Sequence, residues 1–228
     1  MVLDSESRGR IAGAAAIAGG TLGVLLGPIM VMVKYQTGWA VIPEPAWIAA
    51  ATPVFGPLLN FGTPVTRWIV YGSVYTFALV LMFVGLLAAA IHIKERTGRA
   101  QPLGLWVLLV GLGLVIAGDA VHTATWHQNG LTVPTPGTNP VANTGYATHM
   151  MGMNLVMVGS LVAGIAALRR RILATWIGWV LALLPATIVA MSLTLLPTTP
   201  SGGLWMFSVF MIAIGYSLRS GKPRLIAG

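Results

Sequence analysis

Three of the four histidines, and the only carboxylate inside an apolar run, lie within residues 118–153. Two apolar segments flank a proline-rich loop in this stretch, and the polar side chains lie where those segments meet the loop. Imidazole and thioether groups are ligands of copper, and both also bind haem iron. The sequence therefore predicts a set of candidate ligands, which are Asp119, His122, His127, His149, Met150 and Met153.

The helical periodicity of both segments allows Asp119, His122 and His149 to approach one another. At about 100° per residue, Asp119 and His122 are about 60° apart on one helix face. His127 would lie about 140° from His122, which is a poor angle for binding one ion together. Helices joined by a loop are usually neighbours, so His149 is expected at a similar depth. We expect the Asp119 carboxylate to hold an imidazole N–H and fix the tautomer of that histidine.

Three interpretations of this polar cluster remain open from the sequence. Asp119 and His122 can form a structural pair that ties two helices together, with methionines filling gaps. The cluster can instead bind haem or a transition metal, and imidazole together with thioether favours copper. The third interpretation is a membrane hydrolase that uses a bound metal and water, although no spaced motif such as HExxH is present.

The composition is that of a polytopic membrane protein. The chain has 228 residues, of which 56% are hydrophobic and only 8% are charged, whereas soluble domains carry about 25% charged residues. The net charge of +8 is distributed over the loops and not gathered in a patch, so nucleic-acid binding is not expected. The absence of cysteine excludes disulfides and thiolate metal sites.

Apolar runs of about 20 residues, long enough to cross a bilayer core of ~30 Å, indicate membrane-spanning helices. We expect an all-α bundle that forms a single integral membrane domain over residues 1–228. Its six spans are expected at about 11–33, 68–93, 103–126, 146–168, 172–196 and 203–218.

The distribution of cations predicts the orientation of these spans. If the N-terminus is cytoplasmic, eleven of the thirteen Lys and Arg residues also lie on the cytoplasmic side, as the positive-inside rule requires. Only Lys34 and Arg67 then lie outside. The sequence therefore predicts a plasma-membrane protein with both chain ends in the cytoplasm and the polar cluster facing outward.

Residues 36–67 differ in character from the predicted spans. They contain five prolines and two tryptophans, which interrupt otherwise apolar stretches. Prolines at this density prevent a continuous spanning helix, and tryptophans favour the headgroup region. We expect an irregular, interfacial or re-entrant segment of short helical pieces on the outer side.

The first predicted span contains Gly19, Gly23 and Gly27 at intervals of four residues. This spacing places small residues on one helix face and allows a neighbouring helix to approach closely. The face is expected to pack within the chain, and the alternative is a contact with another membrane subunit.

These observations predict an integral membrane protein that binds copper or haem at an outward-facing Asp/His/Met edge. Such a site would serve electron transfer, metal handling or a larger membrane complex. The alternative is a non-catalytic accessory subunit of a membrane complex, in which the polar edge is purely structural. The sequence predicts neither a reaction nor a substrate.

Overall fold

The computed structural model describes residues 5–36, 46–97, 103–128, 139–170, 175–194 and 201–219. These residues form seven α-helices and one short 3₁₀ helix, with no strand among them, so the all-α class is confirmed for the described part of the chain. The elements in chain order are α1 (Ser5–Gln36), α2 (Ala46–Phe55), η1 (Gly56–Leu59), α3 (Pro64–Thr97), α4 (Leu103–Gln128), α5 (Pro140–Arg170), α6 (Thr175–Thr194) and α7 (Ser201–Arg219).

Four of the predicted spans correspond to helices that are long and apolar enough to cross a membrane. Their apolar stretches comprise 25 residues in α1, 28 in α3, 23 in α4 and 30 in α5. The protein is therefore a multi-pass membrane protein. Helices α6 and α7 lie where the last two spans were expected, but their described apolar stretches are only Thr175–Ala190 and Trp205–Tyr216. A crossing by these two helices stays a prediction.

Helix α5 begins at Pro140, one and a half turns before the predicted start of the span at residue 146. The Oδ1 atom of Asn139 accepts hydrogen bonds from the backbone N–H groups of Val141 and Ala142, at 3.0 and 3.1 Å. Asn139 therefore caps the helix, and Pro140 occupies a first position that needs no N–H donor.

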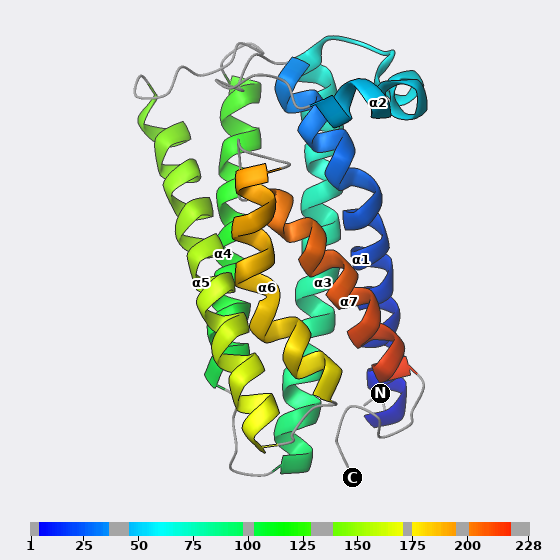
Figure 1. The fold of residues 1–228 in the computed structure, drawn as a ribbon. Helices are drawn as coiled ribbons and strands as arrows, with labels where there is room; N and C mark the ends of the chain where they lie inside the picture. Colours follow the sequence, from blue (N-terminus) through cyan, green and yellow to red (C-terminus); the bar gives the residue numbers. More distant parts are fainter. Residues whose placement is uncertain are drawn as a thin grey trace.

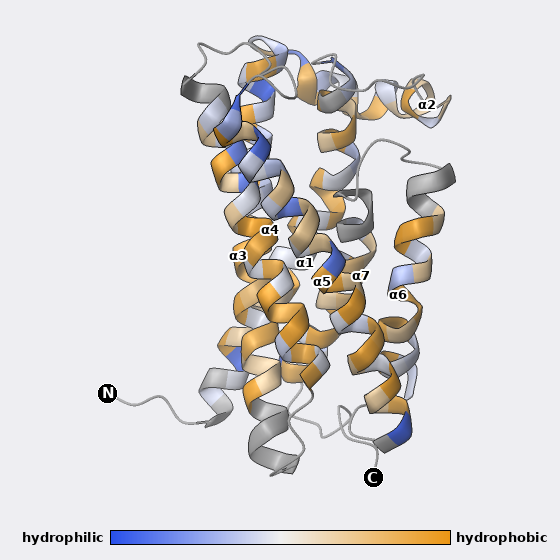
Figure 2. Ribbon diagram, turned by 90° about the vertical axis from the view of Figure 1, so that its left-hand side faces the viewer, coloured by the Kyte–Doolittle hydropathy of each residue, from blue (hydrophilic) through white to orange (hydrophobic). Residues whose placement is uncertain are grey.

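The long helices form one bundle. Helices α4 and α5 are antiparallel neighbours, α1 packs against α3 and α7, and α6 lies between α5 and α7 (Figure 1). We call the end of the bundle that carries α2 the upper end, and the opposite end, where α1 begins and α7 ends, the lower end (Figure 1). Apolar residues dominate most of the bundle, and hydrophilic residues become more frequent toward the upper end (Figure 2).

Glycines at seven-residue intervals join α4 to α5. A Cβ atom added at Gly111 would lie 2.6 Å from the backbone nitrogen of Val156 and 2.8 Å from the carbonyl oxygen of Gly152. These distances are shorter than a Cβ contact allows, so the two backbones touch only because side chains are absent. We call this set the glycine seam, and it consists of Gly104, Gly111 and Gly118 on α4 and Gly145, Gly152 and Gly159 on α5.

The small-residue face of α1 packs within the chain. Gly19 is buried where a Cβ atom would lie 2.6 Å from the carbonyl oxygen of Ala78 in α3. Gly23 lies against Ser208 of α7, and Gly27 lies against the Trp205 side chain. Of the two alternatives for this face, packing within the chain is therefore the one that the structure shows, and a contact with another subunit through it stays a prediction.

A hydrogen bond from α7 compensates for a proline inside α1. Pro28 has no N–H group to donate to the carbonyl of Val24, four residues earlier in the helix. The indole N–H of Trp205 donates to that Val24 oxygen at 3.0 Å. Because Pro28 leaves the Val24 oxygen without its helical donor, this oxygen accepts the hydrogen bond that holds α7 against α1.

The segment before α3 is broken into short pieces, as predicted, in its described part. Helix α2 has 10 residues and η1 has 4, so neither reaches the roughly 20 residues that a span requires. A turn with Gly62 at a positive φ of 54° connects η1 to α3. Residues 37–45, including Trp39, lie outside the described residues.

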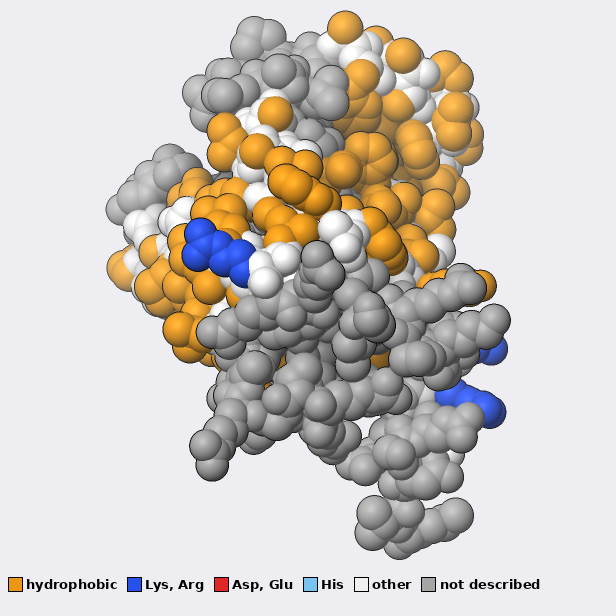
Figure 3. All heavy atoms as spheres, turned by 60° about the horizontal axis from the view of Figure 1, so that its bottom comes forward, with side chains coloured by type: hydrophobic (Ala, Val, Ile, Leu, Met, Phe, Trp, Pro, Cys, Tyr) orange, Lys and Arg blue, Asp and Glu red, His pale blue; other side chains and the backbone are white. Residues whose placement is uncertain are grey.

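The described cationic side chains lie at the two ends of the bundle, and most of them are at the lower end. Arg10, Arg169 and Arg219 are exposed where α1 begins and where α5 and α7 end. Figure 3 looks toward this lower end, where described Lys and Arg side chains appear in blue at the rim. Arg67 lies near the start of α3, at the upper end. The side of the membrane that each end faces stays a prediction.

A reporter that is active only in the cytoplasm should be active when it is fused after Gly228. The same reporter inserted between α4 and α5, for example after residue 133, should be silent, because this loop is predicted to face outward. Paired cytoplasmic and extracytoplasmic reporters at both positions measure the orientation. Cytoplasmic activity at both positions would contradict the predicted topology.

Candidate functional site

The upper part of the glycine seam places Asp119 against α5. A Cβ atom added at Gly118 would lie 2.5 Å from the backbone nitrogen of His149 and 2.7 Å from the carbonyl oxygen of Gly145. The backbones of α4 and α5 therefore touch directly beside Asp119. This close approach allows the short aspartate side chain to reach a side chain on the neighbouring helix.

Asp119 and His149 form a hydrogen-bonded pair between α4 and α5. The Nδ1–H group of His149 donates to Oδ1 of Asp119 at 2.7 Å. The side chains are mostly buried, with 11% of His149 and 21% of Asp119 exposed. A carboxylate that accepts this hydrogen bond requires a proton on Nδ1, and in that tautomer of the neutral imidazole the lone pair is on Nε2. The prediction that Asp119 bonds to a histidine is thus confirmed.

His122 lies one turn beyond Asp119 on α4 and is buried. Its ring packs on the indole of Trp68 from α3 in an edge-to-face arrangement, with 6.1 Å between the ring centroids. Among the described residues, no three His, Cys, Asp or Glu side chains form a group that could hold a metal ion. Contact of His122 and His149 with one shared ligand therefore stays a prediction.

Tyr75 of α3 brings a hydroxyl group into the same region. Its side chain is buried on the same face of α3 as Trp68, which packs on His122. The hydroxyl oxygen is buried and has no hydrogen-bond partner among the described residues. A buried hydroxyl without a partner costs about 1–3 kcal/mol, so a polar atom bound beside it would stabilise the protein.

The candidate methionines of α5 have different environments. Met153, four residues after His149 and on the same helix face, is completely buried, and Met150 is partly buried. Met151 points outward, with 54% of its surface exposed. The side chain of His127, the remaining predicted ligand, lies outside the described residues. Met153 is therefore the thioether best placed to accompany His149.

The contribution of α3 to this site was not predicted from the sequence. Trp68 and Tyr75 are seven residues apart, so they lie on the same face of α3, and both are buried. This heptad spacing of two large aromatic residues with polar atoms was the available signal. It could have indicated a face of α3 that turns inward toward the polar cluster.

Replacing Tyr75 with phenylalanine should raise the free energy of unfolding of the cofactor-free protein by up to about 1 kcal/mol, because it removes a buried hydroxyl that has no protein partner. Tyr71→Phe is the matched control on the same helix, since the Tyr71 hydroxyl donates to the carbonyl oxygen of Leu58 at 2.5 Å. This control should lose about 1 kcal/mol. Thermal unfolding in detergent measures both, and equal losses would contradict the prediction for Tyr75.

The fold and the site together define a multi-pass membrane helix bundle with a mostly buried carboxylate–imidazole pair near its upper end. No protein-family model, curated protein or solved structure matches the chain.

Proposed function

We propose that this membrane protein binds copper, or alternatively haem iron, through His149 at the outward-facing end of the bundle. Such binding would serve electron transfer, metal handling or a larger membrane complex in the plasma membrane. The observation that carries the proposal is the 2.7 Å bond between His149 Nδ1 and Asp119. A carboxylate behind an imidazole is the usual support of a metal-binding histidine, because it fixes the tautomer and raises the basicity of the other nitrogen.

Copper(I) suits the chemistry of this site better than a harder ion. Hard cations require several oxygen ligands, and zinc requires three or four nitrogen, oxygen or thiolate ligands. The described residues supply no such group of three. Soft copper(I) accepts thioether sulfur in addition to imidazole. His149 with the buried Met153 one turn further along α5 offers this combination, and His122 is the proposed second imidazole.

Haem is the alternative cofactor for the same histidines. Two histidines on adjacent helices can ligate haem iron from opposite faces, and methionine can replace one of them. His122 on α4 and His149 on α5 occupy neighbouring helices at the same end of the bundle. Spectroscopy distinguishes this ligand from copper directly.

A second candidate function is that of a non-catalytic accessory subunit. The observation that favours it is that Asp119 and His149 already satisfy one another and tie α4 to α5. In that case the pair stabilises the bundle and binds nothing. Partner subunits would then contact the exposed apolar surfaces of the helices, because the glycine face of α1 is occupied by α3 and α7.

Titration of the purified full chain with copper(I), in competition with a colorimetric chelator, tests the proposal. Met153→Leu should weaken copper affinity by about tenfold or more, because it removes a soft ligand while nearly conserving volume. Met151→Leu is the matched control, since Met151 is exposed on the other side of the helix. Equal affinities of both variants and the wild type would exclude Met153 as a ligand.

A further inference from the structure

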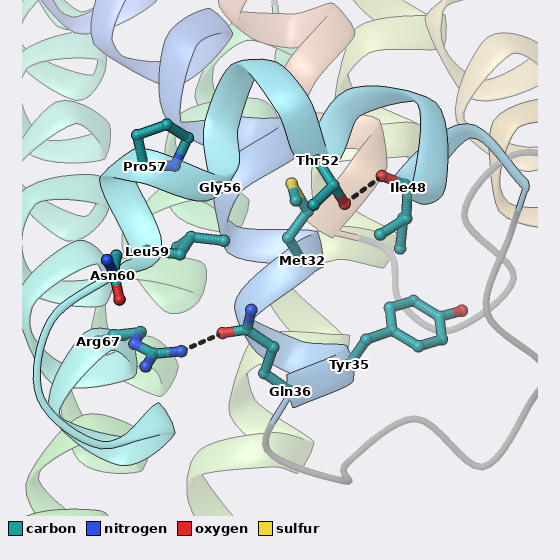
Figure 4. A pocket seen from close by; sticks show the side chains of 10 residues that line it. All are labelled: Met32, Tyr35, Gln36, Ile48, Thr52, Gly56, Pro57, Leu59, Asn60 and Arg67. Carbon is teal, nitrogen blue, oxygen red and sulfur yellow. Dashed lines mark hydrogen bonds between the residues drawn. The ribbon is translucent and has the colours of Figure 1, made fainter.

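A cavity lies at the upper end of the bundle, apart from the Asp119–His149 pair. It has a volume of about 720 Å³, is open to the outside, and is lined by the end of α1, by α2 with η1, and by the start of α3 (Figure 4). This volume is in the range of small-molecule sites. In Figure 4 the Arg67–Gln36 pair lies on one side of the cavity and the Tyr35 ring on the other, with Met32 between them.

Arg67 supplies a fixed positive charge to this cavity. Its Nε–H donates to the carbonyl oxygen of Phe61 at 2.8 Å, and its two terminal nitrogens donate to Gln36 Oε1 at 2.7 Å and to the Gly62 carbonyl at 3.2 Å. All three acceptors are neutral, so none of them cancels the charge. A guanidinium has five N–H groups, and two of them have no acceptor among the described residues, so an anion can bind them. The bonds hold the fork in one position, which favours bidentate binding of a phosphate or carboxylate.

The local backbone is shaped to hold this arginine. Gly62 adopts a positive φ of 54°, and a Cβ atom there would lie 3.0 Å from the Thr66 side chain. The resulting turn presents the Phe61 and Gly62 carbonyl oxygens to Arg67. Thr63 then caps α3, because its Oγ1 accepts the Thr66 N–H at 3.1 Å. The turn and the helix cap together hold the Arg67 guanidinium in a preorganised position.

The remainder of the cavity is mostly apolar. Met32, Ile48 and Leu59 line it and are otherwise buried. The Tyr35 hydroxyl is buried and has no hydrogen-bond partner among the described residues. An occupant that suits these walls has an anionic group for Arg67 and an apolar part for the rest of the cavity.

The position of α2 places this cavity at the membrane interface. The surface of α2 and η1 that faces away from the cavity carries exposed apolar side chains, with Val54 68% and Leu58 49% exposed. A short helix with such a surface lies in the headgroup region of a bilayer and not in water. Anionic headgroups and acyl chains are therefore both within reach of the cavity.

We propose that this cavity is a binding site for an anionic phospholipid, with the lipid phosphate on Arg67 and the apolar part against Met32, Ile48 and Leu59. The proposal is independent of metal or haem binding at His149. It also accounts for the presence of Arg67 at the end of the bundle that is predicted to face outward. The positive-inside rule leads us to expect few cations there. Free phosphate shares the anionic chemistry but has no apolar part, so the experiment includes it separately.

The experiment reconstitutes the full chain into nanodiscs of zwitterionic phosphatidylcholine, with or without anionic phosphatidylglycerol, and measures retained lipid by native mass spectrometry. Wild type should retain phosphatidylglycerol selectively, and Arg67→Gln should lower this retention about tenfold or more, the loss expected for a charged hydrogen bond. Arg169→Gln removes an exposed cation at the lower end and should retain lipid as wild type does.

Two further measurements keep the proposal falsifiable if Arg67→Gln does not fold. Arg67→Lys keeps the positive charge but loses the planar fork of N–H groups, so it should fold and lower retention severalfold. Inorganic phosphate alone should not displace the lipid. Equal retention by wild type, Arg67→Gln and Arg67→Lys, equal retention of both lipids, or displacement by inorganic phosphate would each overturn the proposal.

Discussion

Replacing Gly111 with alanine is expected to lower the free energy of unfolding by on the order of 2 kcal/mol, the cost of inserting atoms into a closely packed contact. The new Cβ atom would lie 2.6 Å from the nitrogen of Val156 and 2.8 Å from the carbonyl oxygen of Gly152. Both are backbone atoms of α5, so no side-chain rotation relieves the overlap. Helices α4 and α5 must move apart, and thermal unfolding in detergent followed by circular dichroism measures the loss.

Gly113→Ala is the matched control for this substitution. It lies two residues away on the same helix, and its new Cβ atom would meet only Phe83 Cε2 at 3.8 Å, an ordinary contact. Alanine also favours a helix over glycine by up to about 1 kcal/mol. The control should therefore be as stable as the wild type or slightly more stable. Equal destabilisation by both substitutions would contradict the close backbone contact at the glycine seam.

His149→Ala is expected to abolish bound copper or haem while the bundle still assembles. Packing in a membrane bundle comes from close contacts over many helix turns and not from one side chain. A lost metal ligand, in contrast, is not replaced by another side chain at the correct distance. Size-exclusion chromatography reports assembly, and metal analysis with visible absorption reports the cofactor. Full cofactor content in His149→Ala would exclude this histidine as a ligand.

Substitutions of Asp119 and His122 distinguish a residue that orients a ligand from a residue that binds the cofactor directly. Asp119→Asn should weaken cofactor affinity by about 10–100-fold without abolishing it, because the carboxylate only orients the ligand. His122→Ala should also abolish binding if His122 is the second imidazole. If the cluster is purely structural, His122→Ala should instead cost about 1–2 kcal/mol of stability with no change in bound species.

Much of the fold could be predicted from hydrophobicity and length. The spans in α1, α3, α4 and α5 followed because runs of apolar residues of this length have no alternative to a membrane helix. The early start of α5 was missed, because Tyr146 resembles an interfacial residue and the cap at Asn139 lies within a proline-rich stretch. The described apolar parts of α6 and α7 are too short for length alone to establish a crossing.

The candidate site could be predicted only in part. Asp119 and His149 lie at facing ends of consecutive helices, so their proximity followed from chain order. The sequence did not identify His149 as the histidine that bonds to Asp119, and the structural interpretation pairs Asp119 with His122. The orientation of His122 toward Trp68 could not be predicted from chain order, because the sequence does not state which face of α3 meets α4. The glycine seam was visible as a seven-residue repeat in two consecutive helices, and it would have fixed the register between them.

The cofactor content of the purified wild-type chain tests the central proposal most directly. The protein should be produced in cells supplied with copper and a haem precursor, and then examined by elemental analysis and visible absorption. We expect about one copper ion per chain, or a haem Soret band, that disappears in His149→Ala. A colourless wild-type protein without bound copper or iron, folded and unable to take up either after addition, would contradict the proposal and leave the Asp119–His149 pair with a structural role.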